Sequence, residues 1–331
     1  MPGFWRARTG KKRRQELGLQ NGSTGAQAYW CPLARIGPWR RTLSKHIEHV
    51  QVCPRGPGHP ELRIGLALSG GFARGIAHIG VLKVLEQAKV PIACVAGSSV
   101  GALIGAVYCA GTPVSEMEKI AYCVRRRHFA QWTISRYGFL SNRRIIKFLD
   151  KFLKVSTFEE LKVPLAVTAT EISTGNPVVF RSGPLGEAVR ASCAYPGVFT
   201  PVKARGQSLV DGALTHPVPT QPLTDMGLDR IIAIHLRTRV GLGGPRNIFD
   251  VIARCYAIAQ ERGISSWRLS ADLVVEPDVR LFRFDDFERT SDLMSAGESA
   301  MHAALPEVLR WFESKWTAPT IEPPIEAWAP V

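Results

Sequence analysis

Short apolar runs alternate with longer amphipathic stretches along the chain from Glu61 onward. Continuous or alternating apolar runs predict strands, and apolar residues spaced three and four apart predict helices. We expect strands at 62–68, 91–96, 163–170, 177–181, 208–210 and 230–236, and helices at 76–89, 99–110 and 184–193. Residues 173–176, Ser-Thr-Gly-Asn, predict a hairpin turn. The order of these elements indicates an α/β fold around a mainly parallel sheet.

The segment from 114 to 160 is predicted to be largely helical, with an amphipathic stretch at 143–153. It contains four ring side chains, His128, Trp132, Tyr137 and Phe139. Because aromatic residues at helical spacing usually face a core, we interpret these side chains as core residues. The alternative is that the segment forms a cap over a functional site.

Positive charge is concentrated near the N-terminus. The 331 residues carry a formal net charge of +14, of which +9 falls in residues 1–60 and +5 in the remainder. Residues 1–60 show no sustained apolar period, so we expect a basic, poorly ordered arm before a folded domain at 61–315 and a Pro-rich tail at 316–331. The arm could contact an anionic bilayer, nucleic acid, or no partner. Nucleic acid is the weakest of these, because the rest of the chain has no reader motif.

The apolar stretches are too short and too interrupted to span a bilayer, and no apolar run follows the first basic residues as in a secretory signal. We therefore expect a cytoplasmic protein, peripheral at the inner face of the membrane where the arm binds lipid. Seven cysteines without a C-x-x-C pair indicate reduced thiols packed as small hydrophobic residues. This pattern argues against a zinc site or a disulfide framework.

Ser99 lies in the stretch VAGSSVGALIGA, residues 95–106, between an apolar run and a helix-prone segment. Gly97 and Gly101 flank it in a Gly-x-Ser-x-Gly pattern. Small flanking residues allow the sharp turn that presents a nucleophilic hydroxyl at the start of a helix. The pattern alone is weak evidence, and a structural turn serine is the alternative.

A second glycine-rich turn, SGGFARG at residues 69–75, follows the first predicted strand. Such a loop directs backbone N–H groups toward one point, where they can bind a phosphate or an oxyanion. The sequence lacks the Gly-Lys-Ser/Thr of a nucleotide loop, and Phe72 replaces the second glycine of the dinucleotide fingerprint. We therefore expect an oxyanion hole, in which Arg74 anchors the loop or attracts an anionic head group.

A serine hydroxyl needs a base, and Asp211 is the first candidate. It ends an apolar strand before Gly212, which places it at the carboxyl edge of the sheet where ligands bind in open α/β folds. His216 and His235 are the alternative bases, for a Ser-His-Asp triad. An Asx turn is the structural interpretation of Asp211, and a core histidine is that of His235.

Together these pieces resemble the patatin-like phospholipase family, particularly its compact bacterial members. The resemblance rests on GLALSGGFARGIAHIGVLKVLE, VAGSSVGALIGAVYCAG, ASCAYPGVFTPV and LVDGALTHPVP, covering roughly Leu62 to Leu236 and more loosely the chain to about Arg310. It implies a three-layer α/β/α sandwich. It also implies hydrolysis of lipid acyl esters, of the phospholipase A or lysophospholipase type, without a metal or cofactor.

The resemblance implies the site residues as well. Ser99 falls on the nucleophile position and Asp211 on the base position of a Ser-Asp dyad that forms an acyl-serine intermediate. The oxyanion hole would be formed by the stretch Gly70, Gly71, Phe72, Ala73 and Arg74. The remaining motif glycines are Gly75, Gly97, Gly101 and Gly212.

One departure from the family falls in the oxyanion loop. The family usually has three consecutive glycines before Arg-Gly, whereas here Phe72 follows Gly70 and Gly71. A bulky residue at positive φ would be strained. We expect a one-residue shift of register, with Ser69 in place of the first glycine. The alternative is that the oxyanion hole is impaired and that the protein is a non-catalytic lipid-binding or regulatory protein.

The sequence leaves the oligomeric state open.

Overall fold

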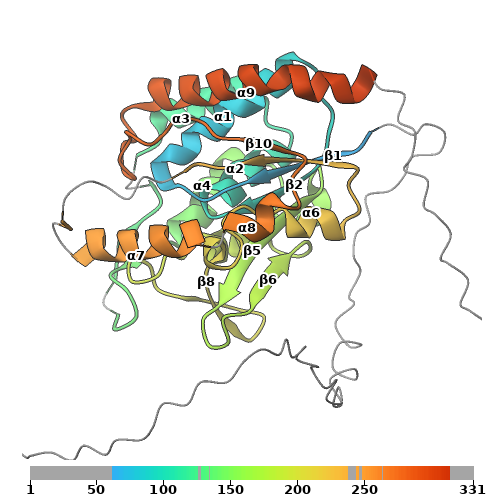
Figure 1. Ribbon diagram of the computed structural model, residues 1–331. Coiled ribbons are helices and arrows are strands. Elements are labelled where there is room, and N and C mark those ends of the chain that lie inside the picture. The colour runs from blue at the N-terminus through green and yellow to red at the C-terminus, as the bar shows by residue number, and fades with distance from the viewer. Residues whose placement is uncertain are drawn as a thin grey trace, which may run out of the picture. The chain divides into compact units, whose positions relative to one another are not determined.

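A mainly parallel sheet forms the centre of the part of the chain that the structure describes (Figure 1). The computed structural model describes residues 62–125, 128–133, 135–237, 244–245, 248–262 and 264–313, so the predicted arm at 1–60 and tail at 316–331 lie outside the described residues. Five parallel strands lie in the order β10 (Leu273–Val275), β9 (Arg230–Ile234), β1 (Ile64–Leu68), β2 (Ile92–Ser98) and β5 (Leu165–Glu171). Antiparallel strands complete the sheet: β6 (Pro177–Phe180), β7 (Val202–Ala204) and β8 (Gln207–Asp211).

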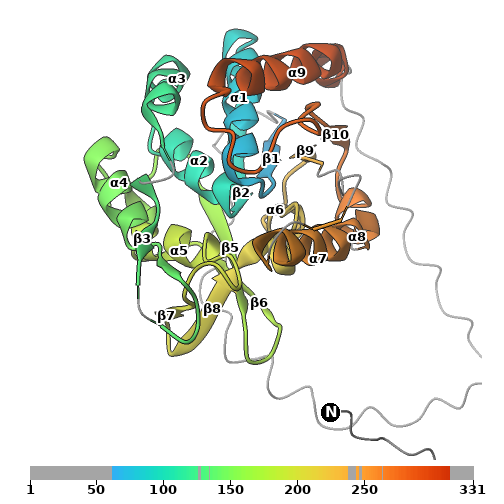
Figure 2. The same ribbon diagram turned by 90° about the vertical axis from the view of Figure 1, so that its left-hand side faces the viewer.

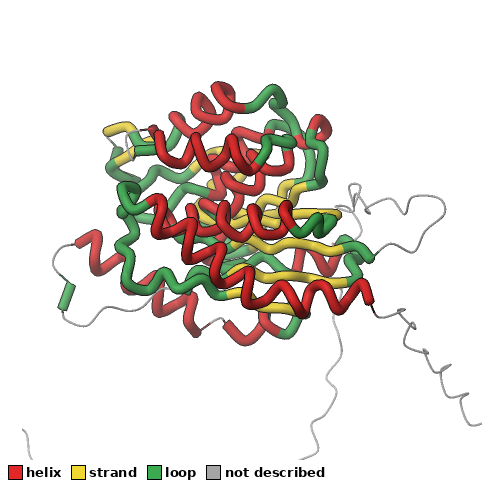
Figure 3. The backbone as a smooth tube through the Cα atoms, turned by 90° about the horizontal axis from the view of Figure 1, so that it is seen from above, coloured by secondary structure: helices red, strands yellow, loops and turns green. Residues whose placement is uncertain are grey.

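Helices cover both faces of this sheet (Figures 2 and 3). On one face lie α1 (Ala77–Gln87), α2 (Val100–Cys109), α5 (Leu185–Ser192) and α9 (Thr290–Glu313). On the other face lie α6 (Gln221–Asp225) and α8 (Ile264–Arg268). The other helices are α3 (Val114–Cys123), α4 (Arg144–Phe152) and α7 (Ile248–Arg262), with 3₁₀ turns η3 (Phe72–Ile76), η5 (Phe158–Glu160) and η6 (Gly212–Leu214).

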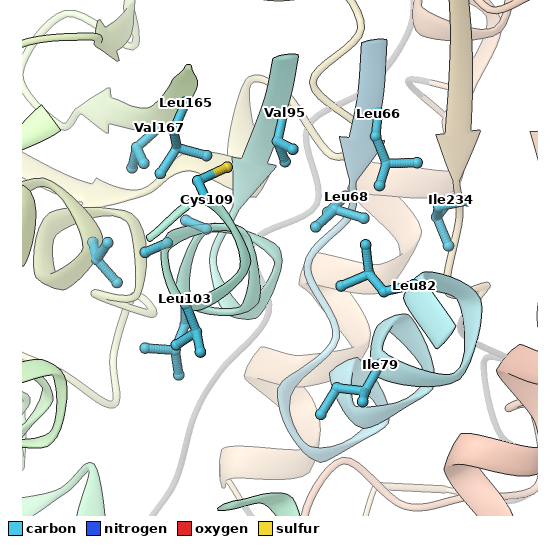
Figure 4. Close-up of a cluster of buried hydrophobic side chains, with 14 of the residues drawn as sticks. Leu66, Leu68, Ile79, Leu82, Val95, Leu103, Cys109, Leu165, Val167 and Ile234 are labelled. Atoms are coloured by element: carbon cyan, nitrogen blue, oxygen red, sulfur yellow. The ribbon is translucent and has the colours of Figure 1, made fainter. Parts of the chain in front are cut away.

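Successive side chains of a strand point to opposite faces of the sheet, and each face packs against its own apolar core. Leu66 and Leu68 of β1 point into the larger core with Leu82 of α1, which Figure 4 shows. Ala67 points into the smaller core, where Trp267 packs. The buried sheet with helices on both faces confirms the expected three-layer α/β/α architecture.

The strand pairing brings the ends of β2 and β8 together. Thr168 of β5 pairs with Ser98 of β2 and also with Val179 of β6. The next residue, Ala169, pairs with Asp211 of β8 and again with β6. Because a strand has only two edges, β2 and β8 lie on the same edge of β5, one after the other. The carboxyl ends of both strands therefore meet, although their residues are more than a hundred positions apart.

Most predicted elements are confirmed, including the hairpin between β5 and β6. The largely helical prediction for 114–160 is wrong between α3 and α4, where β3 (Gln131–Trp132) pairs with β4 (Leu140–Ser141). The core interpretation of three aromatic residues in this segment is also wrong. Trp132 is 79% exposed, Tyr137 62% and Phe139 51%. Helical spacing is not evidence of burial when the segment is a hairpin.

The cysteines divide into buried and exposed thiols. None of the five in the described residues forms a disulfide; Cys94 and Cys109 are buried, as expected, Cys193 is partly buried, and Cys123 and Cys255 are exposed, which corrects that expectation. Cys31 and Cys53 lie outside the described residues. Within the described part of the chain, no helix is both long and apolar enough to cross a membrane.

The turn after β1 contains a strained residue. Phe72 has φ 53°, a left-handed conformation that a bulky side chain normally avoids. Its ring lies edge-on to Tyr195 and Phe284, with ring centroids 5.0 and 5.8 Å apart. These ring contacts hold the residue in place, since the backbone alone would favour glycine there.

This strain predicts an inverted order of stability for two substitutions. Phe72→Ala loses the ring contacts and keeps the strain, whereas Phe72→Gly loses the same contacts and relieves it. We expect Phe72→Gly to be more stable than Phe72→Ala by about 1 kcal/mol in urea unfolding, with both below the wild type. At exposed His302 in the middle of α9, glycine should instead be less stable than alanine by about 1 kcal/mol. Equal or reversed stabilities at position 72 would show that the residue is unstrained.

Candidate active site

Ser99 lies on a sharp turn between β2 and α2. Its backbone has φ 55° and ψ −124°, a strained conformation for a residue with a side chain. A Cβ on Gly97 would lie 2.5 Å from the carbonyl oxygen of Gly101, and a Cβ on Gly101 would lie 2.2 Å from that of Leu68. Both flanking glycines are thus required by close backbone approach, which is the packing that allows the turn.

The turn brings Ser99 to Asp211. The Ser99 hydroxyl donates to Oδ2 of Asp211 at 2.7 Å, and both residues are buried. Oδ1 of Asp211 accepts from the backbone N–H of Ala213 at 2.9 Å and from the Tyr256 hydroxyl at 3.2 Å. The Ser99 N–H donates to the hydroxyl of Ser192 on α5 at 2.8 Å. The carboxylate therefore has a fixed orientation, with one oxygen directed at the serine.

Burial changes the proton affinity of this site. Desolvation raises the pKa of Asp211 from its ordinary value of 3.8 to about 6, and the hydrogen bonds from Ala213, Ser99 and Tyr256 oppose that rise. Burial and the nearby carboxylate raise the pKa of Tyr256 well above its ordinary value, so its hydroxyl remains a donor. Asp211 is consequently a stronger base than an ordinary aspartate while still ionised at neutral pH.

Two carbonyl groups of the glycine-rich loop are held by buried side chains. The Ser69 carbonyl lies 3.0 Å from Nε2 of fully buried His78. Desolvation lowers the pKa of His78 to about 4, so the neutral ring must donate from Nε2. The Gly71 carbonyl accepts from Nε of Arg74 at 3.4 Å. Since the C=O and N–H of a trans peptide point in opposite directions, the N–H groups of Gly70 and Phe72 point away from these anchors.

The loop does not use all the predicted donors. The N–H of Ala73 donates to the Phe284 carbonyl at 3.0 Å, so it is already engaged, which corrects its assignment to the oxyanion hole. Among the hydrogen bonds of the described residues, none uses the N–H of Gly70, Gly71 or Phe72. Arg74 is 8% exposed, and its Nε donates to a carbonyl of the loop itself, in line with the anchoring role. The expected register shift involving Ser69 stays a prediction.

The alternative bases lie elsewhere. Nδ1 of His235 is 3.0 Å from Glu276, and Nδ1 of His216 is 3.3 Å from the Thr215 hydroxyl. Within the described part of the chain, no histidine is among the hydrogen-bond partners of Ser99 or Asp211. The group in contact with the serine hydroxyl is the carboxylate itself.

A cavity of about 1560 Å³ reaches Ser99 and Asp211. It is bounded by Gly70, Gly71 and Phe72 on the loop side, and its deeper walls are apolar side chains such as Ile79, Leu103, Met117, Phe129, Ile145 and Phe148. These side chains come from α1, α2, α3 and α4 and from the segment between α3 and α4. Charged side chains, among them Arg74, Arg144 and Asp285, also line the cavity, so Ser99 lies in a chamber whose walls are mostly but not wholly apolar.

Sequence reasoning missed two residues of the site. Ser192 belongs to the stretch ASCAYPGVFTPV, which contributes to the family resemblance, but the sequence assigned no function to this serine. Tyr256 belongs to no motif; it reaches Asp211 because α7 lies beside η6. The other motif glycines are explained by contact: a Cβ on Gly212 would lie 2.1 Å from the Thr168 carbonyl oxygen, and one on Gly75 would lie 2.4 Å from Val100.

Comparison with known proteins gives the following similarities. Residues 66–224 match the patatin-like phospholipase family. An uncharacterized NTE family protein of Mycobacterium bovis is 36% identical over 185 residues, which are 55% of this chain and 51% of that protein. Lysophospholipase NTE1 of Cryptococcus neoformans is 32% identical over 201 residues, 58% of this chain and 12% of the fungal protein. The chain thus spans about half the length of the mycobacterial relative and a small part of the fungal one.

Among solved structures, VipD from Legionella pneumophila matches 75% of this chain and 67% of its own, with a TM-score of 0.46 and 13% identity. The type III effector ExoU matches 75% of this chain and 53% of its own, with a TM-score of 0.41 and 15% identity. The matched residues include the end of β1, the glycine-rich loop after it, the Ser99 turn and Asp211. It confirms the resemblance seen in the sequence: the chain contains a patatin-like phospholipase domain at residues 66–224.

Proposed function

We propose that the protein is a serine hydrolase of lipid acyl esters, of the phospholipase A or lysophospholipase type. Ser99 is the nucleophile and Asp211 the base. The observation that carries the proposal is the 2.7 Å contact between the Ser99 hydroxyl and the Asp211 carboxylate in the wall of a largely apolar cavity. The lysophospholipase name of the fungal relative supports the same substrate class.

In the acylation step, Ser99 Oγ attacks the carbonyl carbon of the ester and its proton passes to Oδ2 of Asp211. The tetrahedral intermediate then collapses, and the protonated Asp211 returns the proton to the departing alcohol. An acyl-serine remains. The raised pKa of Asp211 favours the first transfer, because a carboxylate with a pKa nearer the working pH accepts the proton more readily.

In the second step, water attacks the acyl-serine and gives its proton to Asp211, which returns it to Ser99 Oγ as the acyl bond breaks and the fatty acid is released. The apolar walls of the cavity hold the acyl chain through both steps. Their burial of methylene groups supplies binding energy of about 0.8 kcal/mol for each group removed from water. A longer acyl chain is therefore bound more tightly until the cavity is filled.

The oxyanion is stabilised by the N–H groups of Gly70 and Phe72, with Gly71 between them. His78 and Arg74 act as positioning residues, because they hold the carbonyl groups of the same two peptides. Preorganised donors of this kind are worth about 3 to 4 kcal/mol each in the transition state. The strained Phe72 is the reason to keep a second candidate, a lipid-binding protein of the same fold without turnover.

The proposal predicts which side chains hydrolysis requires. Ser99→Ala and Asp211→Asn should each lower hydrolysis of a lysophospholipid and of a short-chain p-nitrophenyl ester by roughly a thousandfold or more. His216→Ala and His235→Ala should retain the wild-type rate, because neither ring contacts the dyad. Release of fatty acid and of p-nitrophenol is measured for each purified variant.

The same panel separates the alternatives. Loss of activity in either histidine variant would contradict the dyad and favour a triad. A wild-type protein that binds lipid vesicles but hydrolyses no ester of either kind would favour the non-catalytic candidate.

Tyr256 provides a second test, through pH. Asp211 must be ionised to accept a proton, so kcat/KM for the soluble ester should rise with pH to a plateau, with a midpoint near 6. Tyr256→Phe removes a hydrogen bond that favours the ionised carboxylate. Its midpoint should therefore move to higher pH by about one unit, the effect expected for one hydrogen bond to a charged group.

Tyr122→Phe, at an exposed tyrosine on α3, is the matched control and should leave the midpoint unchanged. A midpoint that stays in place or falls in Tyr256→Phe would show that the tyrosine does not act on Asp211. If Tyr256→Phe only disturbed packing, the plateau of kcat/KM would fall and the pH midpoint would stay in place.

A further inference from the structure

A group of exposed aromatic side chains lies on the β3–β4 hairpin. Trp132 is 79% exposed, Tyr137 62% and Phe139 51%, although such rings are usually at least half buried. Trp132 pairs with Leu140 and shares its face of the hairpin, whereas the adjacent Phe139 lies on the other face. Exposed apolar side chains on both faces of one hairpin mark an interaction surface. We call the described residues Trp132, Tyr137 and Phe139, with Arg136 and Arg143, the hairpin surface.

The backbone holds these rings outward. The N–H groups of Phe139 and Leu140 both donate to the Val198 carbonyl, at 3.1 and 2.9 Å. The N–H of Thr200 donates to the Leu140 carbonyl at 2.9 Å. A Cβ on Gly138 would lie 2.7 Å from the backbone of Phe199, so the hairpin is pressed against this segment. The backbone on the β4 side of the hairpin is therefore held against residues 198–200.

The same region is strongly basic. Residues 119–149 contain eight Lys and Arg residues and no Asp or Glu. This charge of +8 exceeds the +5 carried by residues 61–331 as a whole, so the rest of that part of the chain is net acidic. Six of the eight are described and exposed: Lys119, Arg125, Arg136, Arg143, Arg144 and Lys147. The segment that contains the hairpin thus carries more net positive charge than residues 61–331 as a whole.

The hairpin also stands where the cavity reaches the surface. Trp132 lines the cavity and is at the same time largely exposed, and Gln131 and Leu140 line it as well. The cavity continues from there to Ser99. Figure 2 shows β3, α3 and α4 on one side of the sheet. Side chains from these three elements line the cavity.

We propose that the hairpin surface docks on an anionic lipid bilayer, so that the cavity opens toward the membrane. Trp and Tyr rings favour the head-group level of a bilayer, and Lys and Arg are attracted to its anionic lipids. A protein partner would also meet aromatic and arginine side chains. The lipid surface is favoured because an acyl chain can pass from it into the apolar cavity without crossing water, a point that rests on the proposed function.

Binding of the full chain carrying Ser99→Ala to vesicles tests the docking without hydrolysis. With vesicles of equal parts phosphatidylcholine and phosphatidylglycerol, Trp132→Ser and Tyr137→Ser should each weaken binding about fivefold or more in sedimentation. Leu269→Ser, at a leucine that is 88% exposed after α8, should leave binding unchanged. The N-terminal arm is present in every variant, so it contributes equally to all of them.

Charge is tested with a matched pair. Arg143→Gln, beside the hairpin, should weaken binding severalfold, whereas Arg310→Gln, exposed near the end of α9, should not. Hydrogen exchange of the same chain should slow in residues 131–140 when vesicles are added. The proposal would be overturned if the hairpin and control variants had equal effects, or if vesicles protected residues 1–60 alone. A protein partner would then be the occupant of this surface.

Activity then separates docking from catalysis. In the otherwise unchanged chain, Tyr137→Ser should hydrolyse a soluble p-nitrophenyl ester at the wild-type rate and a vesicle phospholipid severalfold more slowly. Equal rates on vesicles would contradict the docking surface. A chain that hydrolyses neither substrate would overturn the proposed function, while the binding measurements would still decide the docking.

Discussion

The hydrogen bond between Ser99 and Asp211 is the constraint on which the rest of the site depends. It exists because β2 and β8 share one edge of β5 and end at neighbouring positions, Ser98 opposite Thr168 and Asp211 opposite Ala169. The burial that makes the carboxylate a better base also destabilises its ionised form. A pKa of about 6 instead of 3.8 corresponds to about 3 kcal/mol, so the fold is less stable above that pH than with a neutral side chain there.

Residues from other elements hold the strained backbone of this site in place and donate hydrogen bonds to its buried carboxylate. Ser99 and Phe72 both have positive φ, and each is fixed by groups from other elements: Ser192 of α5 for the first, Tyr195 for the second. Tyr195 in turn packs on Tyr256, with ring centroids 4.6 Å apart. The aromatic side chains thus connect the glycine-rich loop to the surroundings of Asp211.

Much of the site could be predicted from sequence because its residues lie in short segments with fixed turns. Ser99 and the glycine loop follow the parallel strands β2 and β1, whose carboxyl ends lie at one edge of the sheet. Asp211 ends the antiparallel strand β8, and it reaches Ser99 because β8 meets the end of β2 along the same side of β5. Tyr256 could not be found in this way, because the position of α7 depends on tertiary packing. The exposure of Trp132 was mispredicted for the same reason: a ring residue indicates a core only when the element that carries it is known.

Covalent labelling with a fluorophosphonate probe, followed by peptide mapping, tests the central contact most directly. The probe reacts with a serine hydroxyl only where a neighbouring base activates it. The account predicts a single phosphonylated residue, Ser99, in the wild-type protein and little labelling in Asp211→Asn at the same pH. Labelling at a different serine, or equal labelling of Ser99 without the Asp211 carboxylate, would contradict it.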